Sequence, residues 1–315
     1  MSQATSVPIA GSHPYRAPAT RRSRSATSGL RWPVLVLFLP PALLLFTIFV
    51  VLPMGEAAWY SFYNWNGYGL PALADWVGFR NYELVFKNSA FRQALSNNFL
   101  IILVSVLVQV PLALWLATMV STRIRGAVTF RLIFFLPYVL ADVAAGMIWR
   151  FVYDGDFGLV AGIAHFAGVD SIYPLANKSL AIYAILGVVV WKYFGFHMML
   201  FIAGLQAIDK QVLEAAEIDG ATPRQKFFHV TLPLLGSTVR LSIFFAVVGS
   251  LQLFDMVMPL TGGGPFNATQ TMVTFLYSFG VMRMQVGFGS AVGVILFVIC
   301  VTLAFGYKRI FMKND

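Results

Sequence analysis

The sequence predicts an all-α protein that crosses a membrane six times, on the basis of its composition and of the spacing of its apolar runs. Of the 315 residues, 58% are hydrophobic and only 11% are charged, with a mean hydropathy of +0.75. Soluble domains usually carry about 25% charged residues. So few charges cannot cover the surface of a soluble chain of this length, so lipid is expected to solvate much of it.

Six apolar runs are each long enough to cross a bilayer, which takes about 20 helical residues. Segments that are charged, or rich in Gly, Pro and Asn, separate them. The expected spans are residues 33–53, 97–120, 130–150, 181–204, 236–258 and 286–306. Together with their connections they form one predicted transmembrane domain, residues 32–315.

The N-terminal segment, residues 1–31, is predicted to be a disordered basic tail. It is rich in Ser, Thr, Ala, Pro and Arg and has too few apolar residues to fold alone. A cleaved secretory signal is the competing interpretation. The apolar run from Pro33 to Pro53 is as long as a full span, and no convincing small-residue cleavage site follows it, which favours an uncleaved helix.

Lys and Arg are concentrated in alternate connections: the N-terminal tail, the segment after the second span, residues 205–235, and the C-terminus. The positive-inside rule therefore places both termini and residues 205–235 in the cytoplasm. The connections expected outside, residues 54–96, 151–180 and 259–285, are too short to form large separate domains.

The net charge of +9 does not indicate a nucleic-acid partner. The basic residues are scattered between apolar runs and form no stripe interleaved with base-stacking aromatics. Cys300 is the single cysteine, so the chain contains neither an internal disulfide nor a zinc site built on cysteine pairs. The histidines show no metal-ligand spacing, and we expect His197 to be a hydrogen-bonded packing residue.

Residues 205–235 predict a helix–turn–helix. Leu205, Ile208, Val212 and Ala216 recur at helical spacing and give one apolar stripe. Gly220 is expected to end this helix, because glycine readily adopts the left-handed conformation. The second helix is expected to begin with Thr222 as N-cap, Pro223 at the first position and Gln225 completing a capping box, and Pro233 is expected to start the fifth span.

Two acidic residues lie where helix stability alone would not place them. Glu217 and Asp219 fall in the last turn of the first helix, where negative charge opposes the helix dipole. This arrangement suggests a basic partner surface. A solvated, charged turn between two spans is the alternative interpretation.

The same segment, EAAEIDGATPRQKFFHVTLP, resembles the EAA loop of ABC-importer permeases. The matching residues are Glu214, Ala215, Ala216 and Gly220, followed by the Leu232-Pro233 ending. Two outer-loop segments are also similar to those of carbohydrate-importer permeases. They are LTGGGPFNATQT from Leu260, and SFYNWNG from Ser61 with WVGFRNYELVF from Trp76. The resemblance covers about residues 30–310.

The resemblance implies a cytoplasmic coupling helix that docks on a separate, dimeric ATPase. The residues it assigns to that contact are Glu214, Ala215, Ala216, Glu217, Asp219 and Gly220. The small Ala215 and Ala216 would permit close approach, and Gly220 would set the angle of the turn. No lysine in the chain follows a glycine, so there is no P-loop. ATP and Mg²⁺ are therefore expected on the partner ATPase, with no cofactor on this chain.

Lys192 lies about halfway along the fourth expected span, where a charge should face protein or a water-filled path. Tyr193 and Phe196 share its helix face. In the family the path runs between the spans that flank the EAA loop, so substrate-path candidates on the fifth span are Gly249, Ser250 and Leu253. The alternative for Lys192 is a buried lysine paired with Asp142 or Asp255, or held in an amide network.

The expected function is therefore half of the membrane pathway of an ATP-driven importer, and no catalysis. Its expected partners are a second homologous permease, the dimeric ATPase and an extracytoplasmic binding protein that delivers a sugar, a polyol or a sugar phosphate. The expected location is a bacterial-type inner membrane. An ion-coupled secondary transporter, supported only by Asp142 and Asp255, and a membrane scaffold that transports nothing are the alternatives.

Overall fold

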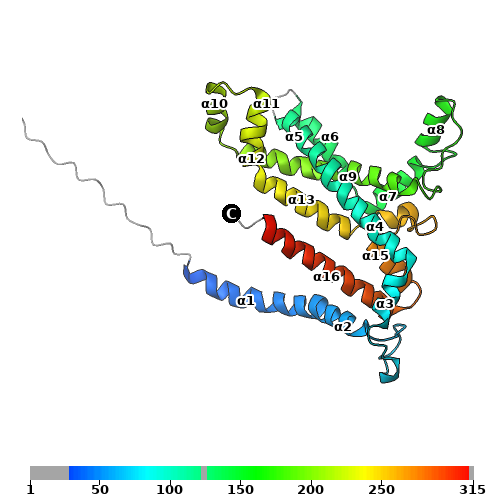
Figure 1. Cartoon of the computed structure of the whole chain (residues 1–315). Helices are drawn as coiled ribbons and strands as arrows, with labels where there is room; N and C mark the ends of the chain where they lie inside the picture. The colour runs from blue at the N-terminus through cyan, green and yellow to red at the C-terminus, as the bar shows by residue number, and fades with distance from the viewer. Residues whose placement is uncertain (1–27, 122–125, 312–315) are drawn as a thin grey trace, which may run out of the picture. The chain divides into compact units, whose positions relative to one another are not determined.

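The computed structural model describes residues 28–121 and 126–311, as helices joined by loops with one isolated antiparallel bridge between Tyr63 and Trp76 (Figure 1). The chain divides into two compact units, of which the first ends at Met54 and the second begins at Gly55. The predicted tail, residues 1–31, lies almost wholly outside the described residues.

Helices of membrane-spanning length and composition form the framework of the described chain. Four are long and apolar enough to cross a bilayer, and two bent helix pairs bring the number to six if each pair forms one span. The four are Val36–Tyr60, Ser89–Val120, Ala181–Ala207 and Val286–Tyr307. The described residues therefore form the all-α, multi-pass architecture that the sequence predicts.

The first span contains α1 (Ser28–Phe46), the π-helical turn η1 (Thr47–Val51) and α2 (Leu52–Tyr60). The second span contains α4 (Ser89–Val104), the π-helical turn η3 (Ser105–Gln109) and α5 (Val110–Ser121). The last span is the single helix α16 (Val286–Phe311).

The third expected span, residues 130–150, is not one straight helix. It consists of α6 (Ala127–Val139) and α7 (Asp142–Val152), which meet at 96°. Leu140 and Ala141 between them are extended, with ψ of 143° and 139°. Apolar length alone does not reveal this break, because the polar contact that satisfies it comes from another span.

The fourth span, α9 (Ala181–Ala207), is the central helix of the second unit. Of its apolar window 61% is buried, against 28% for residues 89–120 and 22% for 286–307. It packs against α5, α6 and α13 (Gly236–Leu251). One apolar cluster contains Ile185 and Val189 with Met256, and another contains Met198 and Phe201 with Ala113.

The segment expected as a helix–turn–helix differs from the prediction at both ends. Leu205 belongs to α9, and Asp209 caps a separate helix, α10 (Lys210–Ile218), by accepting a hydrogen bond from the Gln211 N–H at 2.9 Å. The expected stripe is thus divided between two helices. The prediction missed this break because it continued the helical apolar spacing through Asp209, although aspartate is a strong N-cap residue.

The second arm continues through Pro233. It contains α11 (Pro223–Lys226), the π-helical turn η4 (Phe227–Thr231) and α12 (Leu232–Leu234), and it bends by 68° into α13. The break lies at Leu235 and not at Pro233. The fifth span is also shorter than the expected 236–258, because α13 ends at Leu251.

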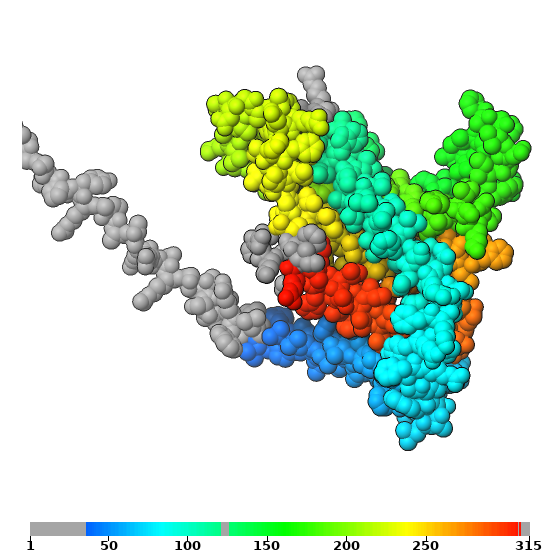
Figure 2. All heavy atoms as spheres, in the orientation of Figure 1, coloured from blue at the N-terminus to red at the C-terminus, as the bar shows by residue number. Residues whose placement is uncertain are grey.

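Short helices fill the connections. They are η2 (Leu73–Asp75), α3 (Arg80–Lys87), α8 (Leu159–Phe166), α14 (Val257–Thr261), α15 (Met272–Phe275) and the π-helical η5 (Leu276–Val281). Within the second unit α10 and α11 lie at one end of the helices, and α3, α8 and α15 lie toward the other (Figure 1). The hairpin formed by α10 and α11 projects at one corner (Figure 2).

Candidate functional site

A glycine brings α6 and α9 into backbone contact. A Cβ on Gly195 would lie 2.1 Å from the carbonyl oxygen of Phe134, closer than any side chain permits. The end of α6 therefore lies directly against α9, next to Lys192 one turn earlier on the same helix. This contact sets the position of the break between α6 and α7.

Lys192 satisfies the polar groups at that break. Its Nζ donates to the carbonyl oxygens of Pro137 at 3.1 Å, Tyr138 at 3.3 Å and Leu140 at 2.5 Å. It also lies 3.1 Å from Oδ1 of Asp142, and the lysine side chain is 1% exposed. The Lys192 cation thus lies at the carbonyl end of α6, and the Asp142 carboxylate lies in the first turn of α7. Each charge is therefore opposite in sign to the helix-dipole end that it faces.

A cavity of about 600 Å³ lies between α9, α13, the π-helical turn η3 and the α6–α7 break. This volume is within the range of small-molecule sites in proteins, roughly 300–1,000 Å³. Aromatic rings, hydroxyls, amides and two carboxylates line it. The lining residues used below are Ser105, Gln109, Tyr138, Asp142, Tyr193, Phe196, His197, Phe245, Gly249, Ser250, Leu253 and Asp255.

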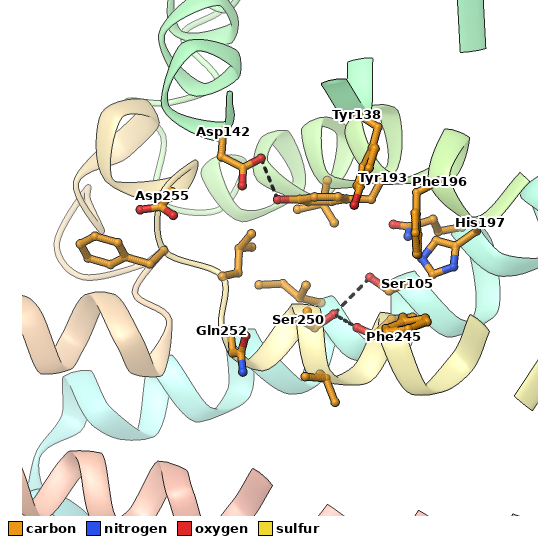
Figure 3. Close-up of a pocket in the computed structure, with 18 residues that line it drawn as sticks. Ser105, Tyr138, Asp142, Tyr193, Phe196, His197, Phe245, Ser250, Gln252 and Asp255 are labelled. Atoms are coloured by element: carbon orange, nitrogen blue, oxygen red, sulfur yellow. Dashed lines mark hydrogen bonds between the residues drawn. The ribbon is translucent and has the colours of Figure 1, made fainter. Parts of the chain in front are cut away.

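The two ends of the cavity differ in chemistry (Figure 3). Asp142 and Asp255 lie at one end, where Oδ1 of Asp142 accepts a hydrogen bond from the Tyr193 hydroxyl at 3.1 Å. The opposite end is aromatic: the rings of Tyr138 and Phe196 stack with centroids 5.0 Å apart. Flat apolar faces beside hydrogen-bonding groups suit a ring-shaped, hydroxylated ligand.

The structure places five of the six predicted path residues on the cavity wall. Tyr193, Phe196, Gly249, Ser250 and Leu253 line it. Lys192 does not, because its ammonium is turned into the helix break. Of the two interpretations that the sequence left open for Lys192, the ion pair with Asp142 is the one observed.

Sequence reasoning missed the contribution of the second span. Ser105 and Gln109 begin and end the π-helical turn η3, line the cavity and are each only 2% exposed. Two polar residues four apart in an apolar run were the available signal. Oε1 of Gln109 is buried and has no hydrogen-bond partner among the described residues, which costs about 1–3 kcal/mol.

His197 is a buried packing residue with a hydrogen-bond partner, as expected. Its Nδ1 lies 2.8 Å from Oγ of Ser242, which joins α9 to α13. It also borders the aromatic end of the cavity. It therefore fixes the spacing of the two helices that flank the cavity.

A buried amide network joins the second span to the end of α13 and to residues 268–272. Nδ2 of Asn97 donates to the carbonyl oxygens of Ala268 and Gln270, each at 2.8 Å. Asn98 donates to the Ser250 carbonyl at 2.7 Å and accepts from the Met272 N–H at 2.8 Å. The second span thus fixes the backbone on which Ser250 and Leu253 sit.

The second candidate site is the helical hairpin, residues 210–226. Gly220 adopts φ +81°, and the Ala221 N–H reaches the carbonyl of Ala216 at 3.0 Å, which is the left-handed ending expected from the sequence. Thr222 and Gln225 form the predicted capping box, with Pro223 at the first position. Two capped helices therefore meet at a fixed angle.

The acids of the hairpin are not equivalent. Glu217 forms an ion pair with Lys226 across the turn. Asp219 is the C-cap residue of α10 and its side chain is exposed. Glu214 is also exposed, and the described residues record no ion pair for it. Glu217 is thus partly neutralised within the chain, whereas Glu214 and Asp219 face solvent.

Known proteins are similar to this chain over most of its length. The sulfoquinovosyl glycerol transport system permease protein of Agrobacterium fabrum is 31% identical over 281 residues, covering 89% of this chain and 91% of the relative. The sn-glycerol-3-phosphate transport system permease protein of the same species is 32% identical over 277 residues, covering 86% and 92%. No family model matches the chain.

The fold also matches a solved structure. A chain in a bacterial alginate ABC transporter, crystallised in complex with an alginate pentasaccharide-bound periplasmic protein, aligns with a TM-score of 0.77. The alignment covers 89% of this chain and 94% of that one at 21% sequence identity.

Proposed function

The chain belongs to the permease subunits of ABC-type sugar transport systems, and we propose on that premise that the described cavity is its share of the path for a carbohydrate. It is a multi-pass membrane protein and a transporter subunit, not an enzyme. The observation that carries the proposal is that one helix, α9, connects the cavity to the hairpin. Tyr193 and Phe196 on α9 line the cavity, and α10 begins three residues after α9 ends.

The hairpin is the proposed contact with a separate, dimeric ATPase. Glu214, Ala215, Ala216, Glu217, Asp219 and Gly220 form the proposed contact set, with Glu214 and Asp219 facing basic groups of the partner. ATP and Mg²⁺ bind that partner. Closure of the ATPase dimer on ATP pushes the hairpin, α9 and α13 transmit the displacement, and the cavity opens outward; hydrolysis reverses this.

Two further partners complete the assembly in this proposal. A second, homologous permease supplies the other half of the path. An extracytoplasmic binding protein delivers the sugar, polyol or sugar phosphate and makes most of the selection. The similar alginate transporter was crystallised with a loaded periplasmic protein, which supports this part of the proposal.

The proposed location is a bacterial inner membrane with both termini and the hairpin in the cytoplasm. The concentration of Lys and Arg in the corresponding connections supports this orientation. Ion-coupled transport has little support, because one of its two candidate acids, Asp142, is already paired with Lys192.

Co-purification with the ATPase tests the coupling role of the hairpin. Proline cannot adopt the positive φ of Gly220, whereas asparagine tolerates it. We expect Gly220→Pro to lose the ATPase and Gly220→Asn to retain it, when each variant is expressed with the genes of the proposed partners. Equal ATPase recovery with wild type and Gly220→Pro would contradict docking through this hairpin.

A further inference from the structure

We propose that the Gln109 amide in the second span is a binding site for a hydroxyl group of an uncharged solute in the cavity. This inference rests on the proposed function, because it assigns a residue and a ligand class to the proposed path. The similarity to sugar permeases does not single out Gln109.

The first argument is the state of the amide itself. Gln109 is 2% exposed, lines the cavity, and its Oε1 lacks a hydrogen-bond partner among the described residues. Buried polar groups in proteins are almost always paired. Gln109 lies on the wall of the cavity, so the unpaired amide borders the space that a ligand would occupy.

The second argument is the local helix geometry. Gln109 ends the π-helical turn η3, and turns of this kind recur at functional sites. Ser105 at the start of the same turn also lines the cavity, and its Oγ lies 3.3 Å from Oγ of Ser250 on α13 (Figure 3). The wall therefore presents an amide and two hydroxyls from two spans, which suits a ligand with several hydroxyl groups.

The third argument is charge. Among the described residues that line the cavity there is no Lys or Arg, and both charged groups are carboxylates, Asp142 and Asp255. The nearby cation, Lys192, is held by Asp142 and three carbonyl oxygens. An anion would meet Asp255 without a compensating cation from this chain, so the ligand class is an uncharged polyol or sugar.

Thermal unfolding of the purified full-length chain separates a ligand-binding from a structural role. Gln109→Met keeps the side-chain length and removes the unpaired amide, so the unfolding midpoint should stay the same or rise. The matched control is Gln270→Met, at an equally buried glutamine whose Oε1 accepts from Thr274 at 2.6 Å. That control should lower the midpoint. A fall for Gln109→Met as large as for Gln270→Met would overturn the proposal.

Shifts of the unfolding midpoint on addition of sugar test whether the cavity binds a ligand. Glucose, maltose and maltotriose at tens of millimolar are the probes, with glucuronate as the charged counterpart of glucose. We expect at least one neutral sugar to raise the wild-type midpoint by about 2 °C or more. Gln109→Met should lose this shift, Gln109→Glu should retain part of it, and glucuronate should produce none.

The opposite outcomes contradict the proposal. No shift from any neutral sugar, or equal shifts in wild type and Gln109→Met, would remove Gln109 from the ligand site, and an equal shift with glucuronate would remove the charge preference. Co-purification of the ATPase with Gln109→Met should stay at the wild-type level. Failure of the ATPase to co-purify with wild type as well would instead contradict the proposed function. Failure of the Gln109 proposal and failure of the proposed function are therefore distinguishable.

Discussion

At the scale of single residues, Lys192 shows how a polar contact shapes an apolar helix pair. Its ammonium takes the place of the backbone N–H groups that α6 would have bonded had it continued. Asp142 then balances the charge at the start of α7. A lysine in the middle of a span thus stabilises a break in the neighbouring span.

Lys192→Met is expected to destabilise the chain by about 3 kcal/mol, because Asp142 and the carbonyls at the break lose their partner. The double variant Lys192→Met/Asp142→Asn should recover part of this loss, since the unpaired charge is gone. Thermal unfolding of the purified chain measures both. Lys178→Met, at an exposed lysine, is the control. Reduced uptake with an unchanged midpoint would instead indicate a direct role of Lys192 in the path.

The two glutamates of α10 should respond differently to neutralisation. Glu217→Gln removes a partly exposed ion pair with Lys226, worth roughly 0.2–1 kcal/mol. Lys226→Gln should therefore have the same small effect on the hairpin. Glu214→Gln should leave the hairpin intact and weaken ATPase binding several-fold. Titration of the ATPase onto each variant measures this, and equal affinity for wild type and Glu214→Gln would remove Glu214 from the contact.

Residue roles followed from the sequence where they depend on neighbours in the chain. Thr222, Gln225 and Gly220 form the predicted caps because capping is local. The partner of Lys192 was left open between two acids, and Gln109 was missed. Both depend on which spans lie side by side, and apolar periodicity does not determine that.

At the scale of elements, the breaks were harder to predict than the spans. Apolar length identifies the helices, but the 96° bend between α6 and α7 depends on Gly195 and Lys192 of α9. The end of α9 at Ala207 depends on Asp209, whose capping role was overlooked. The π-helical turn η3 has no clear sequence signal, although it brings Ser105 and Gln109 to the cavity.

Gly249 on α13 offers a test of the cavity as a path. A Cβ at Gly249 would meet nothing within 4 Å, and the residue lines the cavity. Gly249→Trp should therefore fill the path and reduce sugar uptake about tenfold or more, while stability changes by only about 0.5 kcal/mol. Gly249→Ala should transport normally. Undiminished uptake by the tryptophan variant, measured with the assembled transporter, would place the path elsewhere.

At the scale of the whole molecule, the second unit combines a solute-sized cavity and a capped hairpin on the same central helix. Of the four unbroken spanning helices in the described residues, α9 is the most buried, and it carries residues of the cavity at its middle. The hairpin follows directly after its end. The central claim of the coupling proposal is that the hairpin docks on the ATPase and that α9 passes its displacement to the cavity.

Site-specific photo-crosslinking in the assembled transporter most directly tests the docking of the hairpin on the ATPase, on which that claim depends. Cys300 is the single cysteine, so Cys300→Ala gives a background in which Glu214→Cys or Lys178→Cys is labelled with a benzophenone maleimide. We predict that Glu214→Cys crosslinks to the ATPase and that Lys178→Cys, in the connection expected outside, does not. A crosslink to the ATPase from Lys178→Cys and none from Glu214→Cys would contradict both the coupling role of the hairpin and the proposed orientation.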